Sequence, residues 1–451
     1  MTARYCVVGG GISGLVAAYR LRVTAGPDAS ITVFDPADRL GGVLRTEQIG
    51  NQPVDVGAEA FVARRPEVPA LLAELGLGAR QVGTTGVRPL IYSEGRLHPM
   101  PQGTLQGIPA HAESMTGLVD AAVEARIADE PARPFAWRPG ADPSVADVVG
   151  DRFGDQVVAR SVDPLLAGVY AGSAATIGLR SAVPTLAAAL DSGAPNLTEA
   201  VRRALPPPLT GSVFGAISGG YRVVIDELVA RARVRWAQVA VDRVEREADG
   251  WRLIDDEGTD WNADAVVLAV PAPRLAPMVE AVAPRTAAAA RRIAVASSAL
   301  VVLALPGGTP LPAQSGVLAA SGERLHAKAM TLTSRKWGPR GNVELVRLSF
   351  GRFGDDLARR VGDEELLEWA SDDLATVFGI TADPVDCRVQ RWLDALPQYG
   401  PGHQGVVAEL RAGLPATLAV AGGFLDGIGV PACVASGNRA AAQVSIASVA
   451  R

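Results

Sequence analysis

Residues 9–14 read Gly-Gly-Gly-Ile-Ser-Gly and contain the spacing G-x-G-x-x-G. In this spacing the first glycine permits a tight turn, the second lets a phosphate approach the backbone, and the third lets a helix pack closely on a strand. A helix beginning here would also direct free N–H groups and the positive end of its dipole at the phosphate. The pattern therefore predicts a site for the pyrophosphate of a dinucleotide. The residues expected there are Gly9, Gly10, Gly11, Ile12, Ser13 and Gly14.

An acidic residue follows at the distance expected of a ribose-binding carboxylate. Asp35 lies roughly 20 residues after the last glycine, and Pro36 comes next. The elements that must position these groups are a strand over 4–8, a helix over 15–21 and a second strand over 30–34, which their apolar patterns predict. A glycine triplet alone also occurs in an ordinary strand-to-helix turn. The complete order of strand, glycines, helix, strand and acid argues against that alternative.

The composition narrows the class of protein. A chain of 451 residues is too long for one compact core, so two or three domains are expected. With 48% hydrophobic residues, 20% charged residues and a net charge of −5, the chain resembles a globular enzyme, and nucleic acid is not an expected partner. The three cysteines and four histidines lack the spacing of a disulfide framework or a metal site, so no metal is predicted. No signal peptide or membrane-spanning run is recognised, which favours the cytoplasm.

The segments after Asp35 distinguish a flavin cofactor from a nicotinamide cofactor. Residues 39–43 read Arg-Leu-Gly-Gly-Val, and residues 55–59 read Asp-Val-Gly-Ala-Glu. They resemble the R-x-G-G and D-x-G motifs of the amine-oxidase-like flavoprotein superfamily, and the resemblance implies FAD. The superfamily usually has glutamate where Asp35 stands, but the shorter acid still reaches a ribose. The residues implied at the cofactor are Arg39, whose charge suits a phosphate, together with Gly42, Val43, Gly57, Ala58 and Glu59.

Later segments extend this resemblance to the rest of a flavin site. Val241 begins a V-x-x-V pattern in a predicted antiparallel meander, and its backbone is implied to meet the adenine. Residues 418–421 predict a strand. The following loop and helix are implied to bring N–H groups and a helix dipole to the ribityl chain and the flavin ring. Relatives often carry Asp or Asn in place of Gly423. The residues implied here are Val241, Gly422, Gly423, Ile428, Gly429 and Val430, with Trp392 at the flavin edge.

Four segments, residues 57–65, 88–101, 163–172 and 391–403, resemble porphyrinogen oxidases in particular. They are most similar to the family of bacterial coproporphyrinogen III oxidases that form coproporphyrin, beside the protoporphyrinogen oxidases. A porphyrinogen is a large apolar ring with carboxylate arms, so its site should combine apolar walls, glycines and arginines. For the basic residues the alternative is an ordinary solvated side chain. The implied substrate residues are Arg65, Arg88, Leu165, Leu166, Gly168, Val169, Tyr170 and Lys328.

The resemblance implies a step of heme biosynthesis. A methylene bridge carbon of the substrate would give a hydride to the flavin and a pyrrole N–H would lose a proton, so no catalytic base is assigned. Dioxygen would be the final acceptor and would leave as hydrogen peroxide. Further implied partners are the membrane surface, at the periphery, and a ferrochelatase that takes the product. Protoporphyrinogen IX stays open as the substrate, as do a flavin amine oxidase, which the aromatic content of 5% disfavours, and a flavin protein without oxidase activity.

The expected fold class is α/β, or α+β, with three parts. A Rossmann-like FAD-binding domain is expected from residues 1–85, 217–285 and 405–451. A discontinuous substrate-binding sheet domain is expected from residues 86–100, 180–216 and 286–404. A helical subdomain, which contacts the membrane in some relatives, is expected over residues 101–179.

Overall fold

The computed structural model describes residues 3–207, 211–339, 341–381 and 383–449. Its first sheet has five parallel strands in the order β12-β2-β1-β16-β22. Apart from the edge strand β12, the strands are short apolar runs with few exposed positions, as expected of a parallel sheet covered on both faces. They are β1 (Arg4–Val8), β2 (Ser30–Phe34), β12 (Arg235–Ala237), β16 (Ala265–Leu268) and β22 (Leu418–Val420).

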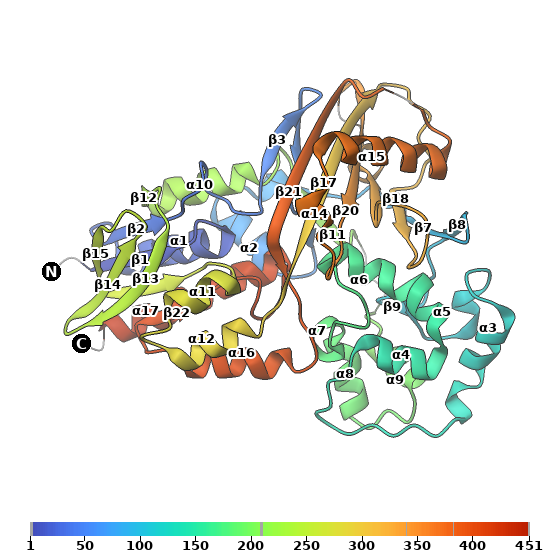
Figure 1. Cartoon of the computed structure of the whole chain (residues 1–451), viewed down its shortest axis with the longest axis horizontal. Coiled ribbons are helices and arrows are strands. Elements are labelled where there is room, and N and C mark those ends of the chain that lie inside the picture. The colour runs from blue at the N-terminus through green and yellow to red at the C-terminus, as the bar shows by residue number, and fades with distance from the viewer. Residues whose placement is uncertain (1–2, 208–210, 340, 382, 450–451) are drawn as a thin grey trace.

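Helices from both ends of the chain cover one face of this sheet. Figure 1 shows α1, in blue, beside α17, in red, and the two helices share one apolar core. The predicted Rossmann-like α/β architecture is therefore confirmed. This face carries α1 (Ile12–Ala25), α2 (Glu67–Glu74), α10 (Arg222–Ala232) and α17 (Val430–Val449). The opposite face carries β13 (Val241–Glu247), β14 (Gly250–Asp255), β15 (Asp260–Ala263), α11 (Ala272–Met278), α12 (Pro284–Arg291) and α16 (His403–Ala412).

The second large sheet is mixed and has seven strands in the order β21-β17-β20-β19-β18-β7-β8. One face packs against α15 (Asp363–Phe378), and the other against the hairpin β3 (Thr46–Ile49) and β4 (Gln52–Asp55). Its strands are β7 (Leu90–Ser93), β8 (Arg96–Pro99), β17 (Val295–Pro306), β18 (Gly316–Ala319), β19 (Ala329–Leu332), β20 (Val343–Phe350) and β21 (Asp386–Pro397). A small sheet of β5 (Phe61–Val62), β11 (Phe214–Ile217) and β6 (Gln81–Gly83) lies beside it, with the short helices α13 (Thr333–Trp337) and α14 (Leu357–Arg360).

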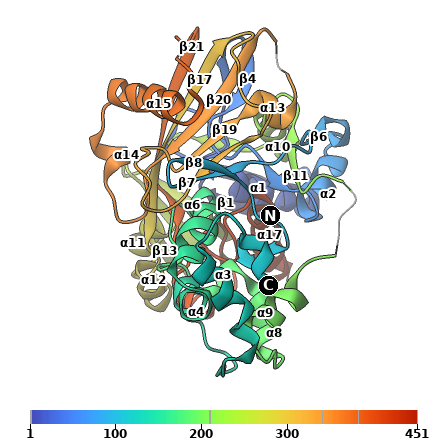
Figure 2. The same ribbon diagram turned by 90° about the vertical axis from the view of Figure 1, so that its right-hand side faces the viewer.

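A cluster of helices lies below this sheet in Figure 2 and has its own apolar core. Helices α7–α9 share that core with α3–α6, although the sequence analysis assigns residues 180–216 to the sheet domain; the domain limits stay predictions. None of the described helices is long and apolar enough to cross a membrane. The cluster contains β9 (Thr104–Leu105), β10 (Ile108–Pro109), α3 (Ala121–Ala128), α4 (Val145–Phe153), α5 (Asp155–Val157), α6 (Asp163–Tyr170), α7 (Leu179–Ala182), α8 (Pro184–Asp191) and α9 (Leu197–Ala204).

Candidate active site

A cavity of about 440 Å³ opens at the carboxyl ends of β1, β2, β16 and β22. Open α/β sheets form ligand sites at this edge, beside the turns that follow the strands. Segments far apart in the sequence meet around the cavity, from the glycine motif to the loop that precedes α17. The predicted cofactor residues on its wall are Gly9, Gly11, Ile12, Ser13, Asp35, Pro36, Gly42, Val43, Val241, Gly422, Gly423 and Ile428.

The glycine motif forms the turn between β1 and α1. Gly9 has φ +104°, a left-handed conformation that favours glycine. A Cβ at Gly11 would meet nothing closer than the Cα of Gly42, 4.0 Å away, so the missing side chain keeps this part of the cavity open. At Gly14 a Cβ would clash with the carbonyl oxygen of Gly9. Gly11 precedes α1 and provides no side-chain cap, so the first N–H groups of the helix are available to an anion.

The carboxylate of Asp35 faces the cavity and also stabilises the turn between β1 and α1. One oxygen accepts a hydrogen bond from the N–H of Gly10 at 2.7 Å, and the other accepts from the N–H of Ala37 at 3.0 Å. Gly10 itself lies off the wall because its Cα faces the side chain of Leu40. Two backbone donors preorganise the carboxylate, and its remaining lone pairs can accept from ribose hydroxyls.

Arg39 lies behind the wall. Its guanidinium donates to the carbonyl oxygens of Leu40, Leu44 and Gly42 at 3.2, 3.1 and 2.6 Å. Burial, followed by the charge of Arg45, lowers its pKa. The side chain borders a second pocket of about 590 Å³ and fixes the loop that brings Gly42 and Val43 to the main cavity. The predicted phosphate contact of Arg39 stays a prediction.

A buried ionic cluster supports the segment 57–59. Glu59 contacts Lys336 at 2.8 Å and Arg347 at 3.0 Å, and all three side chains are largely buried. Burial alone would raise the pKa of Glu59, but the two cations lower it to about 2. Arg347 also donates to the carbonyl oxygen of Gly57 at 2.7 Å. The cluster therefore fixes the backbone beside the cavity, and the sequence analysis did not include Lys336 or Arg347.

Trp392 fixes the same segment from β21. Its indole N–H donates to the carbonyl oxygen of Val56 at 2.8 Å, and a Cβ at Gly57 would approach the ring to 3.2 Å. That Cβ would also clash with the carbonyl oxygen of Val43. Four predicted cofactor residues therefore lie together behind the cavity wall and support the backbone that forms it: Trp392, Gly57, Ala58 and Glu59.

The loop 422–429 closes the cavity on the side of α17. The hydroxyl of Tyr399 donates to the carbonyl oxygen of Gly423, and His403 contacts the carbonyl oxygen of Leu425 at 3.1 Å through Nε2. The rings of Tyr399 and His403 are stacked with centroids 4.3 Å apart. Burial, the largest effect, lowers the pKa of His403.

The start of α17 joins this loop to the glycine motif. Ser13 donates through Oγ to the carbonyl oxygen of Cys433 at 3.1 Å, and Gly429 and Val430 lead into the helix behind the wall. The two ends of the polypeptide therefore form one site.

The predicted substrate residues on α6 lie on different sides of that helix. Leu166 is buried in the core of the helical cluster, Leu165 is half-buried, and Gly168 and Val169 are exposed. The ring of Tyr170 lies 5.5 Å from the ring of Tyr399. Because Tyr399 bonds to Gly423, the end of α6 lies close to loop 422–429.

The predicted basic residues are not gathered at one place. Arg65 pairs with Glu67 at the surface, and Arg88 is also exposed. Lys328 is buried beneath the seven-stranded sheet, only 4% exposed. None of these three residues borders the cavity of about 440 Å³.

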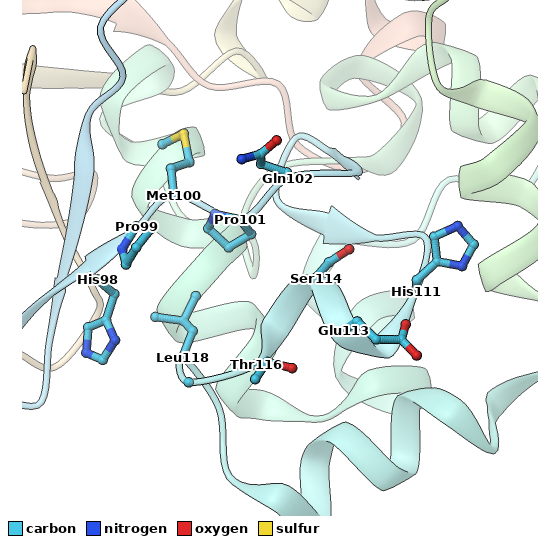
Figure 3. Close-up of a pocket in the computed structure, with 11 residues that line it drawn as sticks. His98, Pro99, Met100, Pro101, Gln102, His111, Glu113, Ser114, Thr116 and Leu118 are labelled. Atoms are coloured by element: carbon cyan, nitrogen blue, oxygen red, sulfur yellow. The ribbon is translucent and has the colours of Figure 1, made fainter.

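A separate pocket of about 560 Å³ lies at the edge of the helical cluster (Figure 3). It contains none of the predicted site residues. His98 and His111 stand on opposite sides of it. Within the described ranges, no group of three or more His, Cys, Asp or Glu side chains is arranged to hold a metal ion.

Comparison with known proteins decides the family. The family model described as flavin containing amine oxidoreductase matches residues 12–445, nearly the whole chain. The chain belongs to this family. FAD is therefore its cofactor. The open backbone at Gly11, the uncapped N-terminus of α1 and the anchored Asp35 fit that cofactor. The chain is an FAD-dependent oxidase.

Individual relatives of this oxidase cover the chain from end to end. The coproporphyrinogen III oxidase of Mycobacterium tuberculosis (strain ATCC 25618 / H37Rv) is 67% identical over 98% of each chain. The crystal structure of a putative protoporphyrinogen oxidase from Exiguobacterium sp. 255-15 is 27% identical, covers 99% of each chain and has a TM-score of 0.88. Cyclohexylamine oxidase from Brevibacterium oxydans, 18% identical with a TM-score of 0.73 over the full length of both chains, shares the fold.

Proposed function

We propose that this oxidase converts coproporphyrinogen III to coproporphyrin III in heme biosynthesis. The observation that carries the proposal is the 67% identity to a coproporphyrinogen III oxidase over 98% of both chains. Identity at this level includes the sheet and the helices that would surround the substrate, besides the flavin domain that many enzymes share. When bound, FAD supplies a hydride acceptor, with dioxygen as the final acceptor and hydrogen peroxide as its product.

The residues at the cavity orient the cofactor. The N-terminus of α1 and the open backbone at Gly11 bind the pyrophosphate, Asp35 binds a ribose, and the backbone at Val241 contacts the adenine. The carbonyl and N–H groups of the 422–429 loop surround the ribityl chain, and Tyr399 holds that loop in place. The long helix α17 begins at this loop, so its positive end favours negative charge on the ring.

Substrate binds at the end of α6. Tyr170, Leu165 and Val169 supply apolar contacts there, and Gly168 leaves room for a broad ring. Arg65 and Arg88 are the proposed partners of the propionates, whereas Lys328 is buried within the seven-stranded sheet. No dedicated base is required because a pyrrole N–H of the substrate releases the proton. His403 is unsuited to that role because its buried ring is stacked on Tyr399 and held through Nε2 by the carbonyl oxygen of Leu425, and because burial lowers its pKa and so weakens it as a base.

The experiment that tests this function compares initial aerobic rates of the FAD-loaded protein on coproporphyrinogen III and on protoporphyrinogen IX, with peroxide as a second readout. We expect faster turnover of coproporphyrinogen III. Faster turnover of protoporphyrinogen IX would support the second candidate, which the likeness to the Exiguobacterium structure and a 27% identical bovine protoporphyrinogen oxidase favour. Peroxide formation only with polyamines would indicate an amine oxidase instead.

We further propose that the enzyme works in the cytoplasm, touches the inner face of the membrane at its periphery and passes its product to a ferrochelatase. Exposed apolar side chains support such contacts. Leu97 on β8 is one of them and is 38% exposed. Flotation with anionic vesicles measures the membrane contact, and Leu97→Ser should weaken it if this side chain inserts.

A further inference from the structure

Two cationic side chains meet where α6 approaches the seven-stranded sheet. Lys328 precedes β19, and Arg352 lies in the turn that follows β20. The ammonium of Lys328 donates to the hydroxyl of Ser298 at 2.9 Å and to the carbonyl oxygens of Phe350 and Gly351 at 2.9 and 2.6 Å. These three acceptors are all neutral. Burial, followed by the charge of Arg352, lowers the pKa of Lys328 to about 7.

Arg352 is a half-buried guanidinium whose charge is not used by the fold. Among the described residues, none hydrogen bonds or ion pairs with this guanidinium, although burial lowers its pKa. The nearest acids are engaged elsewhere. Asp163 accepts from the N–H of Ala174 at 2.6 Å and from Ser321 at 2.8 Å. Asp355 accepts from the backbone N–H groups of Arg352 and Leu357. The guanidinium is therefore available to an anionic ligand, and its partial burial would make such an ion pair stronger than one at the fully exposed surface.

The turn that carries Arg352 is held against the end of α6. Gly351 has φ +84°, and its carbonyl oxygen accepts from Lys328. The N–H of Phe353 donates to the carbonyl oxygen of Ala171 at 2.6 Å, directly after Tyr170. Lys328 therefore anchors one side of the turn and α6 anchors the other. The backbone of this turn thus contacts the end of α6 that approaches loop 422–429 through Tyr170.

We propose that Arg352 binds a carboxylate arm of the substrate and that Lys328 is the positioning residue that holds the Arg352 turn. The inference rests on the proposed porphyrinogen substrate, because a ring with carboxylate arms is the ligand that supplies the missing anion. A guanidinium binds a carboxylate in bidentate fashion, which fixes orientation as well as charge. Arg352 then contributes to substrate specificity, because its guanidinium pairs with a substrate that carries a carboxylate at that point of the ring.

The test compares Arg352→Gln with the matched control Arg360→Gln in the FAD-loaded enzyme. Arg360 is an exposed arginine a few residues away, paired only with Asp356 on the surface. We measure KM and kcat for coproporphyrinogen III and for its tetramethyl ester, which lacks the carboxylate charges. Arg352→Gln should raise KM for the free acid at least about tenfold, with kcat nearly unchanged, and should leave KM for the ester unchanged. The control should change neither value.

Each result decides between the inference and its alternatives. If the wild type oxidises neither porphyrinogen, the proposed function is wrong, and so is the proposed ligand of Arg352. If the wild type is active and Arg352→Gln keeps the wild-type KM for the free acid, the inference alone is wrong. An equal loss on acid and ester, or a lowered Tm, would show that Arg352 stabilises the fold and would also overturn the inference. The variant is expected to fold, because it removes no hydrogen bond of the guanidinium.

Lys328→Met tests the positioning role separately. Loss of the bond to the carbonyl oxygen of Gly351 should raise KM for the free acid with little change in kcat, and should add nothing when Arg352→Gln is already present. If the effects of Lys328→Met and Arg352→Gln on KM are fully additive, or if Lys328→Met keeps the wild-type KM, Lys328 does not position Arg352. The decision on Arg352 does not depend on whether the Lys328 variant folds.

Discussion

The ring of Tyr170, at the end of α6, lies 5.5 Å from the ring of Tyr399, whose hydroxyl donates to the carbonyl oxygen of Gly423. The side chain of Gln398 reinforces the connection by donating to the carbonyl oxygen of Tyr170 at 2.8 Å. Two neighbouring residues of the chain thus join the helical cluster to the loop that borders the flavin cavity. The end of α6 and the loop at the cofactor cavity are therefore held by the same pair of side chains.

The hydroxyl of Tyr399 should matter for cofactor binding. Tyr399→Phe leaves the ring in place but removes the donor to Gly423, so we expect a loss of about 1 kcal/mol in unfolding free energy and a several-fold weaker FAD affinity. Tyr170→Phe is the matched control, because it keeps the ring contact and does not touch Gly423. Flavin fluorescence titration of the apo-protein measures the affinity. Equal FAD affinities for the two variants would contradict the role of this bond.

Gly11→Ala should separate cofactor binding from folding. The added Cβ lies 4.0 Å from Gly42 and meets no closer atom, so the apo-protein should keep its stability. The same methyl group projects into the cavity where the pyrophosphate binds, and FAD affinity should fall at least about tenfold. Gly405→Ala, an open and exposed helical site outside the cavity, should leave the affinity unchanged. A Gly11→Ala enzyme with normal FAD affinity would show that the phosphate lies elsewhere.

Glu59→Gln should destabilise the protein strongly. It removes the carboxylate that pairs with both Lys336 and Arg347 and leaves two largely buried cations beside each other. Breaking a buried pair in this way costs about 3 kcal/mol or more. Glu67→Gln, which breaks the surface pair with Arg65, should cost no more than about 1 kcal/mol. Urea unfolding of both variants gives the comparison, and similar losses would mean that the buried cluster contributes no more than a surface pair.

The stability of the fold should depend on Lys328 above neutral pH. The pKa of its ammonium is about 7 in the folded protein and about 10.5 in the unfolded chain, so between these values the unfolded chain binds the extra proton. Stability then rises with pH across this window, by up to about 1.4 kcal/mol per pH unit. The rise should be absent in Lys328→Met. Urea unfolding of both proteins between pH 7 and pH 10 measures it, and parallel curves would contradict a lowered pKa.

The parts of the site that depend on local sequence could be predicted. The turn at Gly9, the cradle at Gly11 and the acid at Asp35 lie within one strand-helix-strand unit, so spacing alone places them together. Loop 422–429 could be predicted through its resemblance to relatives, and the structure brings Gly422 and Gly423 to the same cavity.

The supporting residues could not be predicted because their partners are remote in the sequence. Arg347 contacts Gly57 and Glu59, which lie 290 and 288 positions earlier in the chain. No local pattern indicates that an arginine in the middle of an apolar strand contacts the distant segment 57–59. Arg352 stands out because none of the acids in the described part of the chain pairs with it, and Asp163 and Asp355, the acids near it, accept hydrogen bonds from other donors. A buried cation in an apolar strand is the one signal that could have identified Arg347.

The central claim is that the two ends of the chain hold a flavin beside a porphyrinogen, and one measurement tests it most directly. FAD-loaded protein is mixed with coproporphyrinogen III without oxygen, and the visible absorption of the flavin is followed. We predict that the flavin band bleaches when coproporphyrinogen III is added, because the first two-electron oxidation reduces the flavin. When oxygen is admitted the flavin band should return and the porphyrin band should appear, because two further rounds of oxidation complete the ring. A flavin band that stays unchanged in the presence of excess coproporphyrinogen III would contradict the account.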